Sequence, residues 1–289
     1  MSTPHLPQPD TRFASERAAA LFADYFASKS AGDADDFVSH YAPEIGTHSD
    51  AVLGYHAPDW AATSAQFHQV MPGWNGGVSY ATRILGDDRS AVVFVTDGPE
   101  LFGSELRTIS AVDLSEGKVV RFVDYWDGRQ LGRDAVAAWR VPAEQFPAAF
   151  GEDRLPPVGH DGLENVISAL VAASASGDVP AVEAMFAPDA TFEDLTLQVA
   201  LHGRVAIAAA LHQAISVLPY GSGVALRRVL GSGPAGGFEW TNTGNAVPRG
   251  ISAVVLDEAG LIGELTSIWD ATLLSPESAD RWAGLLRRR

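Results

Sequence analysis

The chain has 289 residues, of which 36 are acidic and 20 are basic, so its formal net charge at pH 7 is −16. An acidic surface of this kind repels phosphate backbones and anionic lipids, which argues against nucleic acid and membrane surfaces as partners. The sequence has no cysteine, which excludes disulfides, thiolate nucleophiles and cysteine-ligated zinc.

The predicted elements begin with a helix over residues 16–30. Its helical spacing is carried by Leu21, Phe22, Tyr25, Phe26 and Lys29. A short helix in DADDFVSHYA follows the Gly-Asp break, then a strand-like segment, EIGTHSDAVLGYH, and a third helix that begins near Pro58. Four segments with period-two alternation come next and predict strands: VSYATRIL, SAVVFVTD, ELRTISAVDL and KVVRFVDYW. This order is typical of an α+β domain with helices on one face of a curved sheet.

The same order then recurs along the chain. The Trp-Asp endings that begin at Trp126 and Trp269 lie 143 residues apart (269 − 126), and SAGDADDFVSHYAPE matches ASGDVPAVEAMFAPD. Offsets that stay nearly constant over the length of a domain indicate a tandem duplication. We therefore predict two cone-shaped domains, each with three helices packed on a curved antiparallel sheet. The expected boundaries are a flexible segment 1–13, a first domain 14–139, a linker 140–161, a second domain 162–274 and a C-terminal tail 275–289, whose end LLRRR is expected to be solvated.

These words, in this order, resemble the nuclear transport factor 2-like superfamily, which includes SnoaL-type polyketide cyclases, ketosteroid isomerases, scytalone dehydratases and limonene epoxide hydrolases. The resemblance covers about residues 14–130 and 162–274, and its clearest part is ASGDVPAVEAMFAPDATFEDL followed by HGRVAIAAAL. It implies a cavity between the helices and the concave face of each sheet. It also implies that the two domains pair through the outer faces of their sheets, as an intramolecular pseudo-dimer within a monomer or a further homodimer.

The back half of the first copy, TRILGDDRSAVVFVTDG then ISAVDLSEGKVVRFVDYWDG, resembles limonene epoxide hydrolases. The two pocket aspartates of that family match Asp97 and Asp124, which we expect on adjacent strands. Asp124 shares its strand face with Phe122 and Trp126, because side chains alternate along a strand. A carboxylate among apolar groups and near a second acid holds its proton more tightly than a free one. The resemblance therefore implies one acid and one base, as the opening of an epoxide requires.

The sequence departs from that family at one position. Val95, two residues before Asp97, stands where the family has an arginine that clamps the two acids. Arg83 and Arg107 are candidate substitutes from neighbouring strands, or else structural ion-pair partners, because both recur in the second copy. Asp97 also fits a turn residue, since VTDGPE resembles a strand that runs into a turn.

The second copy lacks both acids, and Asn242 and Ser267 stand at their positions. It carries Asp194 in TFEDL instead, which matches the general base of ketosteroid isomerases and also fits a strand-end residue. The oxyanion tyrosine of those isomerases matches Tyr25 in the first copy. Neither copy holds the whole isomerase set, so steroid-type isomerisation is disfavoured.

His48, on the strand expected at the pocket floor, is the histidine best placed for acid–base chemistry. We thus expect catalysis by Asp124, Asp97, His48 and Tyr25. Substrate contacts are expected from Phe122, Trp126, Trp60, Arg107, Asp194 and Trp240.

The function predicted is that of an enzyme that works by acid–base chemistry without a cofactor on a hydrophobic small molecule of natural-product metabolism. Epoxide-opening hydrolases or cyclases and SnoaL-type polyketide cyclases come first, and dehydratases or isomerases second. A non-catalytic binding or scaffold protein with two pockets is the alternative. No metal or phosphate-binding motif and no nucleophile elbow is present. A cytoplasmic location is expected, since no apolar run is long enough to span a membrane and MSTPHLPQPD lacks the features of a signal peptide.

Overall fold

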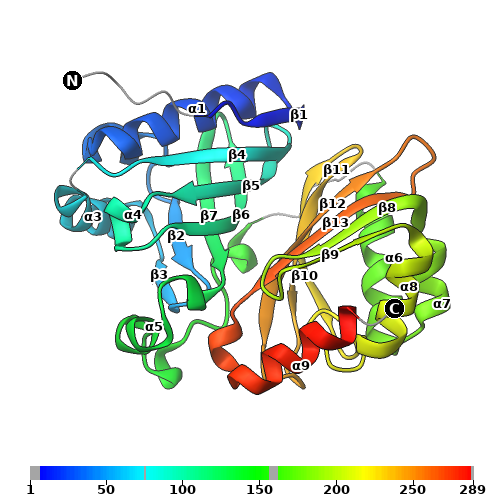
Figure 1. Cartoon of the computed structure of the whole chain (residues 1–289). Coiled ribbons are helices and arrows are strands. Elements are labelled where there is room, and N and C mark those ends of the chain that lie inside the picture. Colours follow the sequence, from blue (N-terminus) through cyan, green and yellow to red (C-terminus); the bar gives the residue numbers. More distant parts are fainter. Residues whose placement is uncertain (1–6, 75, 156–161, 288–289) are drawn as a thin grey trace. The chain divides into compact units, whose positions relative to one another are not determined.

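The computed structural model describes residues 7–74, 76–155 and 162–287 (Figure 1). The chain divides into two compact units. The first comprises residues 1–124 and 130–156, and the second comprises residues 125–129 and 157–289. Within the described ranges, no helix is both long and apolar enough to cross a membrane.

The first unit is built on a seven-stranded sheet with the order β1-β4-β5-β6-β7-β2-β3. Its strands are β1 (Asp10–Ala14), β2 (Thr47–Asp50), β3 (Tyr55–Ala57), β4 (Ser79–Gly86), β5 (Ser90–Asp97), β6 (Leu106–Ser115) and β7 (Lys118–Trp126). Its helices are α1 (Glu16–Ala31), α2 (Ala34–Ser39), α3 (Trp60–Val70), α4 (Pro99–Phe102) and α5 (Arg133–Trp139). The sheet is mixed rather than purely antiparallel, because β1 pairs with β4, and β2 with β7, in parallel.

Helix α1 has well-formed ends and one apolar face. The Ser15 side chain accepts a hydrogen bond from the Ala18 amide at the N-cap, and Gly32 ends the helix with a positive φ of 72°. The side chains of Phe22, Tyr25 and Phe26 are buried against the core of the first unit, as their spacing predicts. The local signals and the tertiary packing therefore agree on this helix.

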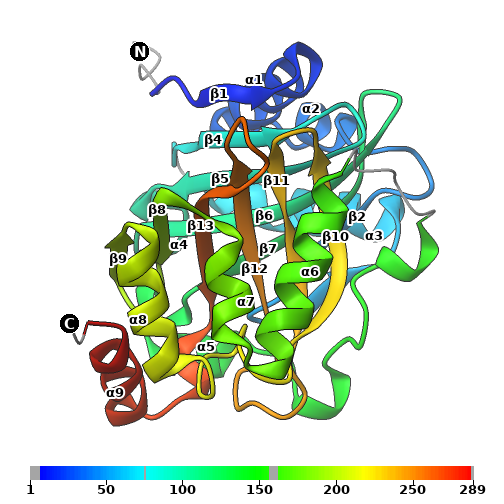
Figure 2. The same cartoon turned by 90° about the vertical axis from the view of Figure 1, so that its right-hand side faces the viewer.

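The second unit is built on a six-stranded sheet with the order β10-β11-β12-β13-β8-β9. Its strands are β8 (Phe186–Asp194), β9 (Val199–His202), β10 (Ala225–Ser232), β11 (Ala235–Thr241), β12 (Arg249–Leu256) and β13 (Ile262–Trp269). Its helices are α6 (Leu163–Ser176), α7 (Val179–Ala184), α8 (Arg204–Ala214) and α9 (Pro276–Arg287). Figure 2 shows α6, α7 and α8 side by side over one face of this sheet. Single 3-10 turns lie at Met71–Gly73, Gly128–Gln130, Ala143–Gln145, Glu152–Arg154 and Ala271–Leu273.

Both units therefore have the predicted α+β class. The expected pairing of the two domains through their sheets stays a prediction, and so do the expected domain boundaries.

Two segments are more structured than the sequence predicted. The segment predicted as a C-terminal tail forms α9, whose Trp282 is buried in the core of the second unit. Leu286, in the run expected to be solvated, is buried there as well. The segment expected to be flexible before residue 14 contributes β1, which pairs with β4. Residues 1–6 and 288–289 lie outside the described residues.

Much of the predicted linker is packed against the first unit. The Val141 amide donates to the Leu53 carbonyl at 2.9 Å, and Phe150 is fully buried. The buried Arg121 donates from Nε to the Phe150 carbonyl at 2.9 Å and forms an ion pair with Asp113 at 3.1 Å. The residues from 156 to 161, also assigned to the linker, are outside the part of the chain that the structure describes.

Candidate functional site

The candidate site of the first unit is built on a stack of three rings. Phe122 of β7 lies between Tyr25 of α1, whose ring centroid is 5.4 Å away, and His48 of β2, at 5.3 Å. The Tyr25 and Phe122 rings are nearly parallel, with an interplanar angle of 8°. Three of the predicted residues therefore meet, and they do so from three different elements.

Asp124 follows two residues after Phe122 on the same strand face. Its Oδ1 accepts a hydrogen bond from Ser110 Oγ at 2.5 Å, and its Oδ2 lies 3.6 Å from Nε2 of His48. The Asp124 side chain remains 23% exposed and that of His48 12%. The carboxyl group is therefore shielded but still within reach of a small molecule.

The surroundings change the protonation of both groups. Burial raises the pKa of Asp124 to about 7, although the Lys29 charge and the Ser110 hydrogen bond oppose the shift. Burial, reinforced by the Lys29 charge, lowers the pKa of His48 to about 3. Near neutral pH, a neutral imidazole thus faces a carboxyl group that still holds its proton part of the time. This pair meets the main requirement for a general acid, a proton that can be given up near the operating pH.

Two tyrosines extend this pair into a chain of hydrogen bonds. The Tyr25 hydroxyl lies 2.8 Å from that of Tyr41, which in turn lies 2.9 Å from Nδ1 of His48. Burial raises the pKa of both phenols well above the usual value, so both stay neutral. The bond at Nδ1 fixes the orientation of the His48 ring, so that Nε2 faces Asp124. Tyr41 was not among the predicted site residues, although the matched Ala-Pro segments align it with Phe186 of the second copy.

The cation of the site is Lys29. Its Nζ lies 2.8 Å from Asp97 Oδ1, and the two side chains are only 13% and 8% exposed. The ammonium also lies 5.7 Å from the centroid of the Trp74 ring. Lys29 was predicted only as part of the first helix, yet its position four residues after Tyr25 puts both side chains on one helix face.

The two arginines considered as replacements for the missing family arginine lie elsewhere. Arg107 pairs with Glu105 at 2.8 Å and is 73% exposed, so it is not in the site, either as a cation or as a substrate contact. Arg83 forms an ion pair with Asp10 at 3.8 Å. Asp97 also differs from the expectation, because β6 lies between its strand and β7, which carries Asp124.

The predicted tryptophans have separate positions. Trp60, at the start of α3, packs against the core of the first unit and donates from Nε1 to the Val38 carbonyl at 3.3 Å. Trp126 is buried at the end of β7, in the short segment 125–129 that groups with the second unit. A substrate contact by either residue stays a prediction. Among the described residues, no group of three or more His, Asp or Glu side chains is arranged to hold a metal ion.

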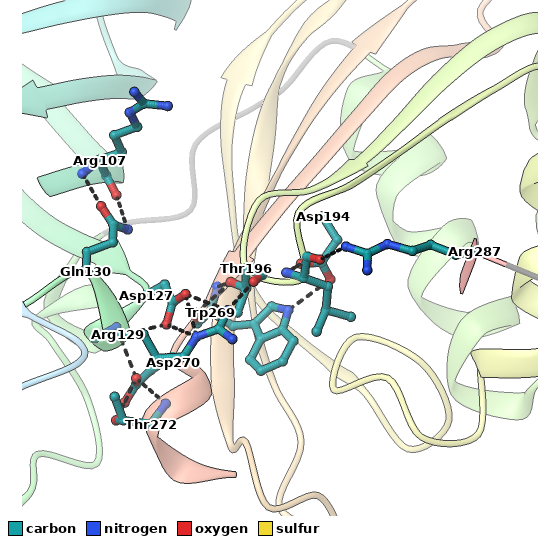
Figure 3. Close-up of polar contacts among 12 residues, drawn as sticks. Arg107, Asp127, Arg129, Gln130, Asp194, Thr196, Trp269, Asp270, Thr272 and Arg287 are labelled. Carbon is teal, nitrogen blue, oxygen red and sulfur yellow. Dashed lines mark hydrogen bonds and ion pairs between the residues drawn. The ribbon is translucent and has the colours of Figure 1, made fainter. Parts of the chain in front are cut away.

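Asp194 of the second unit accepts hydrogen bonds from side chains and from the backbone. Tyr220 donates its hydroxyl to Oδ2 at 2.7 Å and Trp269 donates its indole N–H to the same oxygen at 3.1 Å, while the Leu197 amide donates to Oδ1 at 2.7 Å. Figure 3 shows the Trp269 indole directed at Asp194. Burial raises the pKa of Asp194 to about 6 despite these bonds. This carboxylate is fully engaged, and only 1% of it is exposed.

The space above the second sheet is largely filled. Trp240 is fully buried and donates from Nε1 to Ser252 Oγ at 3.2 Å, and Ser252 Oγ lies 2.7 Å from Ser267 Oγ. A Cβ on Gly250 would lie 2.2 Å from the Trp240 ring, so the glycine makes room for the indole. A small apolar cavity remains beside Tyr220 and Phe238, and its free interior of about 20 Å³ has room for about one water molecule.

A comparison with protein families identifies part of the second unit. Residues 167–262 match the family described as SnoaL-like domain, so the second unit is a SnoaL-like domain, as the sequence predicted. No curated protein matches the chain.

Several solved structures are similar to about half of the chain. One is an uncharacterized bacterial protein with a cystatin-like fold from Silicibacter pomeroyi, at 25% identity over 44% of this chain and 82% of the other, with a TM-score of 0.33. A putative ketosteroid isomerase from Kribbella flavida gives 21% identity over 52% and 88%, with a TM-score of 0.34. A SnoaL-like protein of unknown function from Burkholderia thailandensis gives 9% identity over 39% and 98%, with a TM-score of 0.34.

Proposed function

We propose that the first unit is a cofactor-independent acid–base catalyst that opens an epoxide in an apolar small molecule, by hydrolysis or by ring closure. The observation that carries this proposal is the pair formed by Asp124 and His48. A carboxyl group with a pKa raised to about 7 lies beside a neutral imidazole, among aromatic rings that suit an apolar substrate.

The reaction needs one proton donor and one proton acceptor. Asp124 gives its proton to the epoxide oxygen as the C–O bond breaks, while the oxygen of water or of a substrate hydroxyl forms the new C–O bond. Asp97, an anion paired with Lys29, is the proposed base that takes the proton of the nucleophile. The same two groups would serve a dehydratase or an isomerase, so the substrate decides between these reactions.

The proposal is tested with the Asp124→Asn variant of the full chain and a panel of epoxides that carry apolar substituents. Removal of a general acid lowers turnover by roughly 10²–10⁴-fold. We expect that loss, with ligand affinity unchanged, because the amide keeps the shape of the carboxyl group. Asp24→Asn, on the exposed face of α1, is the matched control and should keep full turnover.

Two results would overturn the proposal. Asp124→Asn could keep the turnover of the wild type, which would remove Asp124 from the chemistry. Alternatively, the wild type could bind members of the panel without converting any of them, and then a small-molecule binding protein would be the better description.

A further inference from the structure

Lys29 is one of only two lysines in the chain, and only 13% of its side chain is exposed. A lysine side chain is rarely buried without a charged partner, because water solvates its ammonium strongly. Here the partner is Asp97, and the Trp74 ring covers another side of the ammonium. In the second unit Ser174 stands at the position equivalent to Lys29. Asn242 stands at the position equivalent to Asp97. The cation and its acid are thus both confined to the unit that carries Asp124.

The course of α1 brings Lys29 toward Asp124. The helix begins where the Ser15 amide donates to the Gly86 carbonyl, and it ends where Ser30 Oγ donates to the Ser79 carbonyl at 2.9 Å. Ser79 pairs with Asp97, so α1 runs along the sheet toward the end where β5 stops.

The ring stack sets the register of the helix against the sheet. Tyr25 stacks on Phe122, and one further helical turn advances about 6 Å to Lys29. Two further strand residues advance about 6.6 Å from Phe122 to Asp124. The matched advance puts the backbone of Lys29 level with that of Asp124 along the strand, and the ammonium at the end of its side chain contacts Asp97.

We propose that Lys29 is a positioning residue of the acid, whose charge acts through space to set the pH range in which Asp124 holds its proton. The inference rests on the proposed function, because it concerns the same acid. Lys29 does not take part in proton transfer itself. Its charge keeps Asp124 acidic enough to release the proton in spite of the apolar rings around it.

Several other groups also face Asp124. The titratable or charged side chains near it are His48 and Asp50 of β2, Asp97 of β5, Tyr25 and Lys29 of α1, and Tyr41. Lys29 opposes the raised pKa of Asp124 more strongly than Ser110 does, whereas Asp50 and Asp97 add to it and Asp97 adds least. If Lys29 is replaced, the pKa of Asp124 should therefore rise, even if Asp97 takes up a proton when it loses its partner.

Because the charges of Lys29 and Asp97 act on Asp124 in opposite ways, replacing them should shift its pKa in opposite directions. Lys29→Met should raise it by about one unit or more, as expected when a nearby opposite charge is removed. Asp97→Asn should lower it by a smaller amount, because the variant removes a like charge and frees the ammonium. Both variants break the same buried ion pair, so a purely structural role would affect them alike. The measurement is a pH titration of the Asp124 carboxyl carbon by NMR.

Two further variants act as controls. Lys29→Arg keeps the charge and should keep the wild-type titration. Lys118→Met removes the other lysine, whose Nζ donates to the Ser39 carbonyl at an exposed position, and should change nothing. Where Lys29→Met does not fold, Lys29→Gln removes the same charge while keeping a polar end on the side chain, and it should raise the pKa of Asp124 in the same direction.

The activity profile gives an independent result. The protonated acid is the active form, so turnover should fall as the pH rises through the pKa of Asp124. Lys29→Met should move this fall in turnover to higher pH. Asp97→Asn is followed by titration alone, because it removes the proposed base. Titration shifts of the expected sign without any turnover would leave the inference standing and overturn the proposed function. Equal shifts in both variants, or none, would overturn the inference whatever the activity.

Discussion

At equivalent positions of their sheets, the two units fill the space above the strands with different side chains. In the first unit Val95 pairs with Thr108 across β5 and β6, and the space beyond them holds the Asp124 carboxyl group. In the second unit Trp240 pairs with Gly250 across β11 and β12, and the indole occupies the space. One large side chain and one glycine thus replace two medium-sized side chains.

The polar layer beneath follows the same division. Ser110 donates to Asp124 in the first unit, whereas its counterpart Ser252 bonds to Ser267 and to the Trp240 indole. The second unit has no carboxyl group at that position and needs no cation to balance one. The comparison shows how a duplicated domain can keep its strand register while one copy fills the space in which the other holds its acid.

The largest expected effect comes from removing the indole that fills the space above the second sheet. Trp240→Ala should lower the free energy of unfolding of the second unit by about 3–5 kcal/mol, because it leaves a cavity where a fully buried indole was. Urea denaturation, with hydrogen exchange of the β11 and β12 amides, measures the loss. Trp139→Ala removes an indole that is 53% exposed and should change stability by less than about 0.5 kcal/mol. A loss below about 1 kcal/mol for Trp240→Ala would contradict the assignment of this residue as core packing.

The next effect tests the pairing of large and small side chains. Gly250→Thr should destabilise the second unit by about 3 kcal/mol, because its Cβ would overlap the Trp240 ring. Combining it with Trp240→Val recreates the pair found in the first unit, and the double variant should be more stable than the sum of the single changes predicts. Strict additivity in this double-mutant cycle would show that the two positions are not coupled.

The third effect is a pH dependence centred on Asp194. Its pKa in the folded state is raised to about 6 from an ordinary value of 3.8, so its contribution to stability is fully present below about pH 4. That contribution is lost as the pH rises through the folded-state pKa, and it amounts to roughly 3 kcal/mol (6 − 3.8 units at 1.36 kcal/mol each). The difference in unfolding free energy between wild type and Asp194→Asn should fall by most of this amount between pH 4 and pH 7. Asp280→Asn, at an exposed position on α9, serves as the control.

The smallest effect compares the two serines. Ser110→Ala and Ser252→Ala should each lower stability by about 1 kcal/mol, because each removes a buried hydrogen bond. Only Ser110→Ala should also raise the pKa of Asp124, since its hydroxyl stabilises the ionised form. NMR titration of Asp124 in both variants separates the two. A shift caused by Ser252→Ala would show that the carboxyl group responds to distant changes in packing.

Much of the fold followed from periodicity. The helical spacing around Tyr25 and the alternation in β4 to β7 are local patterns, and the structure keeps them. The α9 helix had a comparable signal that was missed, because Ala279, Trp282, Ala283 and Leu286 recur at helical spacing before the arginine-rich end. The arginine-rich end was interpreted as a solvated tail because of its charge.

The site was less accessible to sequence reasoning. Asp124 and His48 could be proposed from strand alternation and family resemblance, and the structure brings them within 3.6 Å. Lys29 could not, because a lysine on an amphipathic helix is usually solvated, and only the tertiary packing against Asp97 shows otherwise. The match of Trp240 with Gly250 was out of reach for a related reason, since it depends on cross-strand register between segments that are separate in the sequence.

The α9 helix has a consequence for the newly made chain on the ribosome. Trp282 packs against Trp269, and Arg287 donates to the carbonyl groups of the loop that follows Asp194. Because domains fold as units, the first unit can fold while the second is still being synthesised. The second unit must wait until Leu286 has left the ribosome before its core is complete. Until then the nascent chain presents the apolar surface around Trp269, which is the kind of surface that chaperones bind.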